Sequence, residues 1–434
     1  MLIKARHGLI LLFVCVLLLT GCYKDDSKLT NNSVDNAVIT LAAGRHLAPG
    51  NKDGFYCSKI LEVWEPLITG DEHGNPKPCL AQSWEMTPDG KTWTFYLRKG
   101  VIFHDGSRFD ADAVLENFKR MEKGIKKSNF YTLDINSFYP GLKEVKKIDA
   151  YTIQLIFNVP NFQQLFNMMN FGSAIYGPKC FDENGDFNGI VIGTGPFVIE
   201  KNVLNKYVLL VRNEKYYGAI AKTKSIMIKN IPNPEVRYSA LKANEIQGVL
   251  DLNALPPFLA HEITQDERFA VSTNKSSMIR FLLLNEEKFP FNDVRMRKAI
   301  SLAIDRPALI ESLYLNYAKP TSNILNYTSP FYVEQPIEHN VKEAKALVME
   351  VMNGKRLSAR YCINGADILQ KGEAELIAFW LSKIGIDITI QSLEYSTLAT
   401  KLRSGDYEIA RSQQGMANGD PYLIFSSFMM PHEA

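Results

Sequence analysis

Seven histidines and six cysteines are the side chains of this 434-residue sequence best suited to act as nucleophiles, general bases or metal ligands. Their spacing matches no zinc-protease, nucleophile-elbow, phosphate-loop, dinucleotide-binding or Cys-x-x-Cys motif. The histidines are dispersed, so a Ser/His/Asp site can be neither assembled nor excluded from spacing alone. We therefore expect a protein that is not an enzyme and holds no catalytic cofactor.

A glycine-rich segment, Gly-Thr-Gly-Pro at 193–196, superficially resembles a phosphate-binding loop. Such loops present backbone N–H groups at the start of a helix. Pro196 has no N–H to offer, and the residues after it, Phe197 to Ile199, favour a strand rather than a helix. The segment therefore predicts a tight turn that leads into a strand.

The N-terminus carries a further reactive group, the thiol of Cys22. Lys4 and Arg6 precede an apolar stretch at 9–19, which is shorter than the roughly 20 residues of a bilayer span and typical of a secretory signal. It is followed by Leu-Thr-Gly-Cys at 19–22, which resembles the bacterial lipobox, where a signal peptidase cuts before a cysteine that carries diacylglycerol. We expect a lipoprotein signal peptide at 1–21, lipidation of Cys22 and a flexible polar tether at 22–36. The alternative is an uncleaved membrane anchor, and both place the body outside the cytoplasm.

Four more cysteines follow the tether, at 57, 79, 180 and 362. In an oxidising compartment Cys57 and Cys79 could form a disulfide, provided that their Cα atoms lie within about 7 Å. The sequence does not give that distance, so the pairing stays open. No histidine or second cysteine stands at the spacing of a structural zinc site.

The composition is that of an ordinary globular protein, with 46% hydrophobic and 22% charged residues. This excludes disordered, collagenous and small disulfide-stapled chains. At roughly 150 residues per domain, the length predicts two or three domains. The formal net charge is +2 and the basic residues are scattered among acidic ones, so we expect no nucleic-acid partner.

The hydrophobic pattern predicts an α/β protein. Alternating Trp93, Phe95 and Leu97 follow an Asp-Gly turn, which predicts a β-hairpin from 84 to 97. Asp110 stands where it can cap a helix, and the segments 151–157 and 207–211 have the composition of strands. We also predict one long helix over 294–314, with an apolar stripe formed by Ala299, Ile300, Ala303 and Ile304.

Nine sequence motifs stand in a fixed order between residues 65 and 421. They are Glu-Pro-Leu at 65–67, Leu-Ala-Gln-Ser-Trp at 80–84, Asp-Gly-Lys-Thr-Trp-Thr-Phe at 89–95, Leu-Arg-Lys-Gly-Val-Ile-Phe-His-Asp-Gly at 97–106, Gly-Thr-Gly-Pro-Phe at 193–197, Arg-Asn-Glu-Lys-Tyr-Tyr-Gly at 212–218, Phe-Asn-Asp-Val-Arg-Met-Arg-Lys-Ala at 291–299, Ala-Ile-Asp-Arg at 303–306 and Gly-Asp-Pro at 419–421. Motifs of these types in this order resemble those of the family 5 extracellular solute-binding proteins, and the resemblance covers residues 37 to 434. Proteins of this family serve ABC importers of peptides and nickel.

The resemblance implies a type II periplasmic-binding-protein clamp of two α/β lobes, the first with an extra subdomain. Lobe I is expected over 37–275, with the turn at 193–196 in its scaffold, and lobe II over 276–434. Compared with the family, the sequence ends early, so lobe II is expected to be incomplete and the return of the chain into lobe I missing. Such clamps close on a ligand and present the closed form to a permease.

For peptide ligands, the resemblance implies an aspartate three residues before the Asp of Gly-Asp-Pro, which pairs with the α-ammonium group. This sequence has Ala417 at that position. Because a buried cation needs a carboxylate partner, Ala417 disfavours a peptide ligand unless another carboxylate substitutes.

The closest resemblance is to the nickel-binding subgroup, which coordinates a Ni(II)-chelator complex through one histidine in the loop after Asp-Pro. His432 lies in that loop, one residue from the family position, and imidazole suits Ni(II). Cys57 falls where the subgroup has a methionine near the metal. Tyr56, with Arg45, His46 and Trp64, is expected to line the same face of lobe I. The subgroup's chelate-flanking tryptophan and arginine are not retained.

We therefore expect a monomeric, lipid-anchored substrate-binding protein of an ABC transporter, in the periplasm or at the outer face of the cytoplasmic membrane. It would capture a nickel chelate for permease subunits and their cytoplasmic ATPase. The alternatives are a di- or oligopeptide-binding protein and a non-transporting relative, either a sensor or a vestigial truncated copy.

Overall fold

The computed structural model describes residues 38–47, 60–71, 75–123, 135, 139–169, 173–250, 254–273, 276, 278–327, 329 and 331–415. The chain divides into two compact units, an N-terminal unit that ends at Leu255 and a C-terminal unit that begins at Pro256. The signal peptide and tether predicted from the sequence lie outside the described residues.

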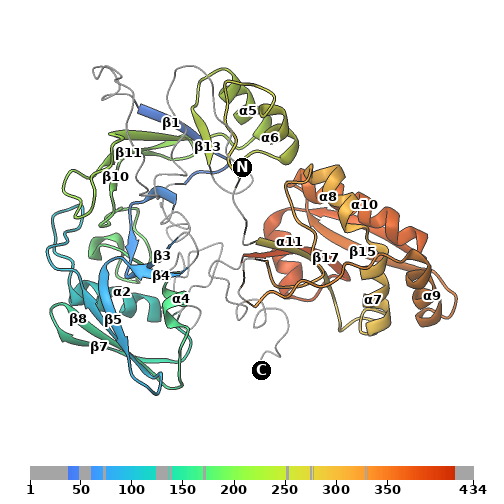
Figure 1. The fold of residues 1–434 in the computed structure, drawn as a ribbon, viewed down its shortest axis with the longest axis horizontal. Helices are drawn as coiled ribbons and strands as arrows, with labels where there is room; N and C mark the ends of the chain where they lie inside the picture. The colour runs from blue at the N-terminus through green and yellow to red at the C-terminus, as the bar shows by residue number, and fades with distance from the viewer. Residues whose placement is uncertain are drawn as a thin grey trace. The chain divides into compact units, whose positions relative to one another are not determined.

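The N-terminal unit contains a five-stranded mixed sheet (Figure 1). Its strands in spatial order are β10 (Phe197–Val203), β11 (Tyr207–Arg212), β12 (Ser225–Asn230), β1 (Val38–Ala43) and β13 (Gly248–Leu250). Strand β1 is parallel to both neighbours, β12 and β13, whereas β11 is antiparallel to β10 and β12. Helix α5 (Pro234–Lys242) lies between β12 and β13 in the chain. The predicted turn at 193–196 does lead directly into a strand, and the strand predicted at 207–211 is β11.

A second, antiparallel sheet of the same unit has the order β5 (Ala81–Met86), β6 (Thr92–Leu97), β8 (Thr152–Phe157) and β7 (Leu142–Asp149). The predicted hairpin is confirmed as β5 and β6, and Trp93, Phe95 and Leu97 are all buried on one face. Helix α2 (Ala111–Lys123) packs on β7, and its first turn is capped by the Asp110 carboxylate, which accepts a hydrogen bond from the Asp112 N–H at 3.0 Å.

Short elements complete the N-terminal unit. Strand β2 (Glu65–Pro66) pairs with β9 (Ala174–Ile175), and β3 (Ile68–Gly70) pairs with β4 (Pro76–Pro78). Helix α4 (Gln164–Met168) packs near β3, and a 3-10 turn, η2 (Pro178–Cys180), follows β9. The pairing of β2 with β9 places the Glu-Pro-Leu motif beside a chain segment more than a hundred residues away.

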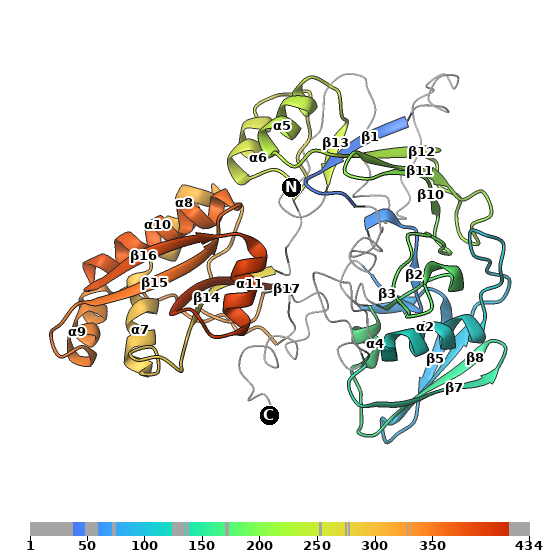
Figure 2. The ribbon, with the colours of Figure 1, turned by 180° about the vertical axis from the view of Figure 1, so that it is seen from behind.

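The C-terminal unit is built on a four-stranded sheet with the order β14 (Met278–Leu284), β17 (Ile409–Gly415), β15 (Leu357–Asn364) and β16 (Ile386–Leu393). Its helices are α6 (Pro257–Ile263), α7 (Val294–Ala303), α8 (Arg306–Tyr314), α9 (Val341–Val351), α10 (Ile368–Lys383) and α11 (Tyr395–Arg403). Helix α10 packs on β15 and β16 with α8 beside it, and α9 packs on α7 (Figure 2).

Successive side chains of β15 and β17 enter two different clusters, as the two-residue period of a strand requires. Tyr361 and Ile409, which pair across the strands, pack with the buried face of α10. Cys362 and Ala410, the next pair, pack instead with Leu398 of α11. Each face of this sheet is therefore covered, and residues two apart from Ile409 share the α10 side.

The prediction of one long helix over 294–314 is wrong. The chain forms two helices, α7 and α8, because Asp305 leaves helical geometry and its carboxylate accepts a hydrogen bond from the Ala308 N–H at 3.0 Å, which caps a new helix. Pro307 lies in the first turn of α8, where a missing N–H costs nothing. The predicted apolar stripe itself is correct, since Ala299, Ile300 and Ala303 are buried.

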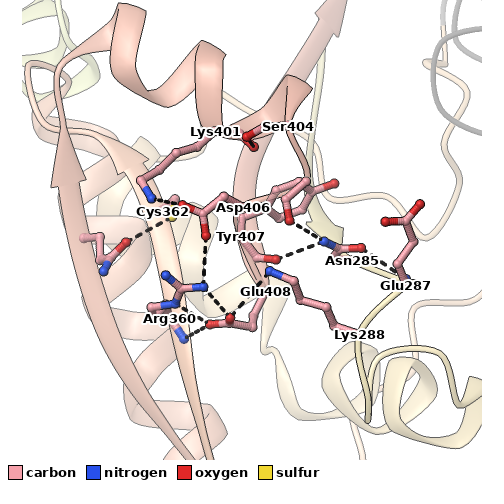
Figure 3. A network of polar contacts seen from close by, with 12 residues as sticks. Asn285, Glu287, Lys288, Arg360, Cys362, Lys401, Ser404, Asp406, Tyr407 and Glu408 are labelled. Atoms are coloured by element: carbon pink, nitrogen blue, oxygen red, sulfur yellow. Dashed lines mark hydrogen bonds and ion pairs between the residues drawn. The ribbon is translucent and has the colours of Figure 1, made fainter.

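A polar network holds the start of β17 against β15 and β14 (Figure 3). Arg360 donates to both carboxylate oxygens of Glu408, at 2.8 and 2.6 Å, and to Asp406 at 3.3 Å. Asp406 also pairs with Lys401, and the Asn285 amide donates to two backbone carbonyls just before β17, at 2.9 and 3.1 Å. The hydrogen bonds from Arg360 lower the pKa of Glu408. These contacts fix the register of β17.

In the part of the chain that the structure describes, no helix combines the length and the apolar character needed to cross a bilayer.

Candidate functional site

The sequence assigns a lipid to Cys22 and ligand contacts to Tyr56, Cys57, Ala417 and His432, with His432 as the metal ligand. All five residues lie outside the described residues, as does Gly-Asp-Pro at 419–421. Their roles therefore remain predictions.

Three residues expected beside Tyr56 are described. Trp64 belongs to the core of the N-terminal unit, where it is 3% exposed and its indole N–H donates to the Ile192 carbonyl at 3.0 Å. Its ring also packs on that of Tyr176, with 5.1 Å between ring centres. Arg45 and His46 are half-buried, and the His46 ring hydrogen-bonds to the Asn202 side chain at 2.8 Å. The structure thus gives Trp64 a packing role.

The carboxylate of Glu65 is the meeting point of three sequence motifs. One oxygen accepts hydrogen bonds from the hydroxyls of Tyr216 and Tyr217, at 2.7 and 2.9 Å, and the other accepts from Thr194 at 2.8 Å. Glu65 itself is 7% exposed. A buried carboxylate is tolerated only when its oxygens are hydrogen-bonded, and here three donors meet that need. The motifs at 65–67, 193–197 and 212–218 therefore serve as scaffold.

The Cys79 thiol lies next to this carboxylate, with its Sγ 3.8 Å from Oε1 of Glu65. Burial raises the pKa of Cys79 to about 12, and the charge of Glu65 adds to the effect. Burial also raises the pKa of Glu65, although its hydroxyl donors act in the opposite direction. Because the thiolate is the nucleophile and metal ligand, Cys79 is an unreactive thiol at neutral pH. It is free, so the structure does not contain the disulfide with Cys57 that the sequence left open.

His104 fixes the glycine turn at 193–196 rather than acting as a base. Its Nδ1 accepts a hydrogen bond from the Gly193 N–H at 3.2 Å, and its Nε2 lies 3.0 Å from the Gly195 carbonyl oxygen. The contacts assign the proton to Nε2. Burial lowers the pKa of His104, which keeps the ring neutral.

The C-terminal unit contains a cavity of about 1030 Å³, lined by residues of β14, β15, β17, α7, α8, α10 and the segment 315–327. Pockets for small ligands have volumes of roughly 300–1,000 Å³, so this cavity can hold a molecule of that class. Among the described residues, no group of three or more His, Cys, Asp and Glu side chains could hold a metal ion.

A buried ion pair is part of the lining of this cavity. Arg411 is on the α10 side of β17, two residues after Ile409, and its Nε lies 3.0 Å from the Glu373 carboxylate of α10. Both side chains are at least nine-tenths buried, and the Tyr314 hydroxyl of α8 donates to the same carboxylate. Burial alone would lower the pKa of Arg411, but the charge of Glu373 outweighs it and the pKa is raised. Tyr361 of β15 also lines the cavity.

Comparison with known proteins identifies the family to which this architecture belongs. A model of the bacterial extracellular solute-binding proteins, family 5 (middle region), matches residues 75–432. The chain belongs to this family. The resemblance inferred from the motifs is thereby confirmed, and the family serves ABC importers that take up small solutes.

Two curated relatives in the family carry different solutes in their names. The nickel-binding periplasmic protein of Escherichia coli (strain K12) is 28% identical over 394 residues, which are 86% of this chain and 74% of the relative. The dipeptide-binding protein of the same organism is 26% identical over 376 residues, which are 81% of this chain and 69% of the relative. These comparisons therefore show that the chain is a solute-binding protein of family 5, but they do not identify its solute.

The crystal structure of NikA from Brucella suis in complex with Fe(III)-EDTA superimposes with a TM-score of 0.78 at 24% identity, covering 91% of this chain and 83% of that chain. This likeness confirms the predicted fold class, the two-lobed type II binding-protein fold of α/β lobes.

The cavity residues Tyr314, Tyr361, Glu373 and Arg411 were not singled out by the sequence pattern. A signal for one of them is present: Glu373 stands on the same face of α10 as the buried Ile377 and Leu381, where an apolar residue is expected. An ionisable residue on a core-facing stripe needs a partner, but its identity depends on the strand that packs there.

Proposed function

We propose that this protein is the lipid-anchored, extracytoplasmic binding component of an ABC importer that captures a nickel-chelator complex. The observation that carries the proposal is the similarity to a nickel-binding periplasmic protein over 86% of the chain. The cavity in the C-terminal unit has the volume for a small chelate. Delivery to permease subunits driven by a cytoplasmic ATPase, binding as a monomer and the absence of catalysis are parts of the proposal.

The residues predicted for the metal site agree with nickel chemistry. Imidazole is a good ligand for Ni(II), so His432 can supply one coordination position and a small chelator the others. A single protein ligand also permits release to a permease. The thiol of Cys57 is a second candidate near the metal, since soft sulfur ligands bind late transition metals well.

A short peptide is the second candidate solute, and the similarity to a dipeptide-binding protein at 26% identity favours it. Against it stands Ala417, which puts no carboxylate where the resemblance implies a partner for the α-ammonium group. The mass of the solute that co-purifies with the protein, read by native mass spectrometry, separates a metal chelate from a ladder of peptides.

Replacing His432 by alanine is expected to abolish binding of Ni(II) presented with L-histidine. A direct ligand should contribute more than the roughly 10–100-fold that outer-shell partners contribute to metal affinity. Isothermal titration of the wild type and of His432→Ala measures the difference, and His261→Ala, a substitution in α6, is the matched control. Undiminished nickel affinity in His432→Ala would contradict the site assignment.

The lipid anchor can be tested separately through Cys22. In cells, Cys22→Ser is expected to lose the lipid-linked mass increase and to move from the membrane fraction to the soluble fraction, because serine cannot form the thioether. Retention of the variant in the membrane fraction would favour the uncleaved anchor instead.

A further inference from the structure

Three large apolar side chains are exposed at one end of the four-stranded antiparallel sheet of the N-terminal unit. Phe162 is 60% exposed, Val159 is 57% exposed and Met86 is 37% exposed. Met86 is the last residue of β5, and the other two lie in the loop that follows β8. Both strands pair antiparallel with β6, so the end of β5 and the end of β8 meet beside the start of β6. We call Met86, Val159 and Phe162 the apolar tip.

The loop after β8 is held in place by the polar contacts of the buried Asn161. Its backbone N–H donates to the Gly90 carbonyl at 2.8 Å, and its carbonyl accepts from the Trp93 indole N–H at 2.8 Å. The side-chain amide of Asn161 donates to the Gln164 side chain at 3.0 Å. The Phe162 ring lies against the turn at Gly90, where an added Cβ would be 2.7 Å from it. The loop therefore holds Phe162 in an exposed position, and a contact made there loses little conformational entropy.

The charged side chains around the apolar tip have both signs. The turn after β5 has exposed Asp89 and Lys91, and β7, which begins beside the end of β8, has exposed Lys143 and Glu144. The Asp89 carboxylate accepts hydrogen bonds from the Thr87 hydroxyl at 2.6 Å and from the Lys91 N–H at 3.1 Å, which lower its pKa and keep it charged. These side chains form no basic cluster that would attract anionic lipids. Attraction to a partner is therefore left to the apolar side chains.

The apolar tip is too small to hold a protein partner by itself. Its exposed area is roughly 300 Å², at about 150–250 Å² for a fully exposed large side chain, whereas a stable interface needs about 800 Å² from each partner. A bilayer needs no matching surface, and the predicted lipid on Cys22 would keep one close. The tether at 22–36 has an r.m.s. length of roughly 20 Å and a full extension of about 50 Å, and a unit of this size has a radius of gyration of about 17 Å. The tether therefore allows the tip to reach the bilayer, at a high effective concentration.

We propose that the apolar tip enters the interfacial region of the phospholipid bilayer to which the protein is anchored, with Val159 and Phe162 among the upper acyl chains. This rests on the lipid anchor of the proposed function. Transfer of exposed apolar side chains out of water drives the contact. The backbone N–H and carbonyl of Asn161 are already hydrogen-bonded within the protein, so they lose no water on entry. The contact orients the N-terminal unit on the membrane surface.

Tryptophan reporters in the whole lipid-anchored chain test the contact. Phe162→Trp and Val159→Trp are reconstituted separately into phosphatidylcholine vesicles, with or without bromine on the upper acyl chains, where bromine quenches a tryptophan on contact. Each reporter should show blue-shifted emission and lose fluorescence in the brominated vesicles, measured against the wild type with its four tryptophans. The matched control is Leu204→Trp, at a 71% exposed position in the turn between β10 and β11, which should not be quenched. Urea denaturation confirms that the variants fold.

Flotation of the chain with the vesicles separates failure of the anchor from failure of the tip. If the wild type does not float, it has no lipid, and the anchor and the contact that rests on it both fail. If it floats but neither reporter is quenched, or Leu204→Trp is quenched as strongly, the contact of the tip is overturned and the anchor stands. High salt should leave the quenching unchanged, because the contact is apolar. Loss of quenching in high salt would show that charged residues hold the body at the membrane, against the proposal.

Discussion

The variant Arg411→Met is expected to destabilise the C-terminal unit by about 3 to 5 kcal/mol. Removal of the guanidinium leaves the Glu373 carboxylate buried, with the Tyr314 hydroxyl as its remaining donor among the described residues. A buried charge without a counter-charge costs several kcal/mol, whereas the ion pair as a whole contributes little, because desolvation of both groups offsets their attraction. The stability lost in Arg411→Met therefore measures the cost of burying an unpaired carboxylate, not the net contribution of the ion pair.

A double variant distinguishes the two contributions. Arg411→Met/Glu373→Gln removes both charges and keeps an acceptor for Tyr314, so it should recover most of the stability that Arg411→Met loses. The matched control is Arg356→Met, which breaks the exposed pair of Arg356 with Asp387 and should cost no more than about 1 kcal/mol. Urea denaturation gives the free energies of unfolding.

Hydrogen exchange shows where the loss occurs. Because the chain has two compact units, its unfolding need not be two-state, and a local readout is required. Faster exchange in Arg411→Met should be confined to α10, β15 and β17. A double variant no more stable than Arg411→Met would show that the side chains matter for packing and that the charge argument is wrong.

The elements that the sequence predicted well are those with local causes. The hairpin of β5 and β6 follows from an Asp-Gly turn and from alternating Trp93, Phe95 and Leu97, all within a short segment. The prediction of one helix over 294–314 failed for an equally local reason. Asp305 is a helix cap and Pro307 is suited to a first turn, so the two together indicate a new helix, although the apolar stripe continues up to them.

The candidate site depends on contacts that the sequence does not encode locally. Glu373 meets Arg411 only because α10 packs on the face of the sheet to which the odd-numbered residues of β17 point. Three of the motifs that identified the family meet at the Glu65 carboxylate, namely those at 65–67, 193–197 and 212–218. These contacts form only when β2 is paired with β9 and the glycine turn is folded. The motifs were therefore sufficient to identify the family, whereas the residues that line the cavity of the C-terminal unit come together only through three-dimensional packing.

The glycine turn supports a second prediction of large effect. Gly193→Ala is expected to destabilise the N-terminal unit by about 3 kcal/mol or more, at the upper end of overpacking effects. An added Cβ would lie 2.0 Å from the Val63 carbonyl oxygen and 2.8 Å from the Trp64 ring, so the backbone itself must move. That movement would also disturb the hydrogen bond from the Gly193 N–H to His104. Urea denaturation, with hydrogen exchange in β2 and β10, measures the effect.

Gly100→Ala is the matched control, because it adds the same methyl group but destabilises the protein for a different physical reason. Gly100 has φ +78° and no heavy atom within 4 Å of an added Cβ, so alanine there meets only the left-handed backbone penalty of about 1–2 kcal/mol. Gly193 is not among the glycines with positive φ, so its cost is steric alone. If Gly193→Ala loses no more stability than Gly100→Ala, the backbone around Val63 can move to accommodate a methyl group. In that case the close approach of the glycine turn to Val63 is not what holds Thr194 against Glu65.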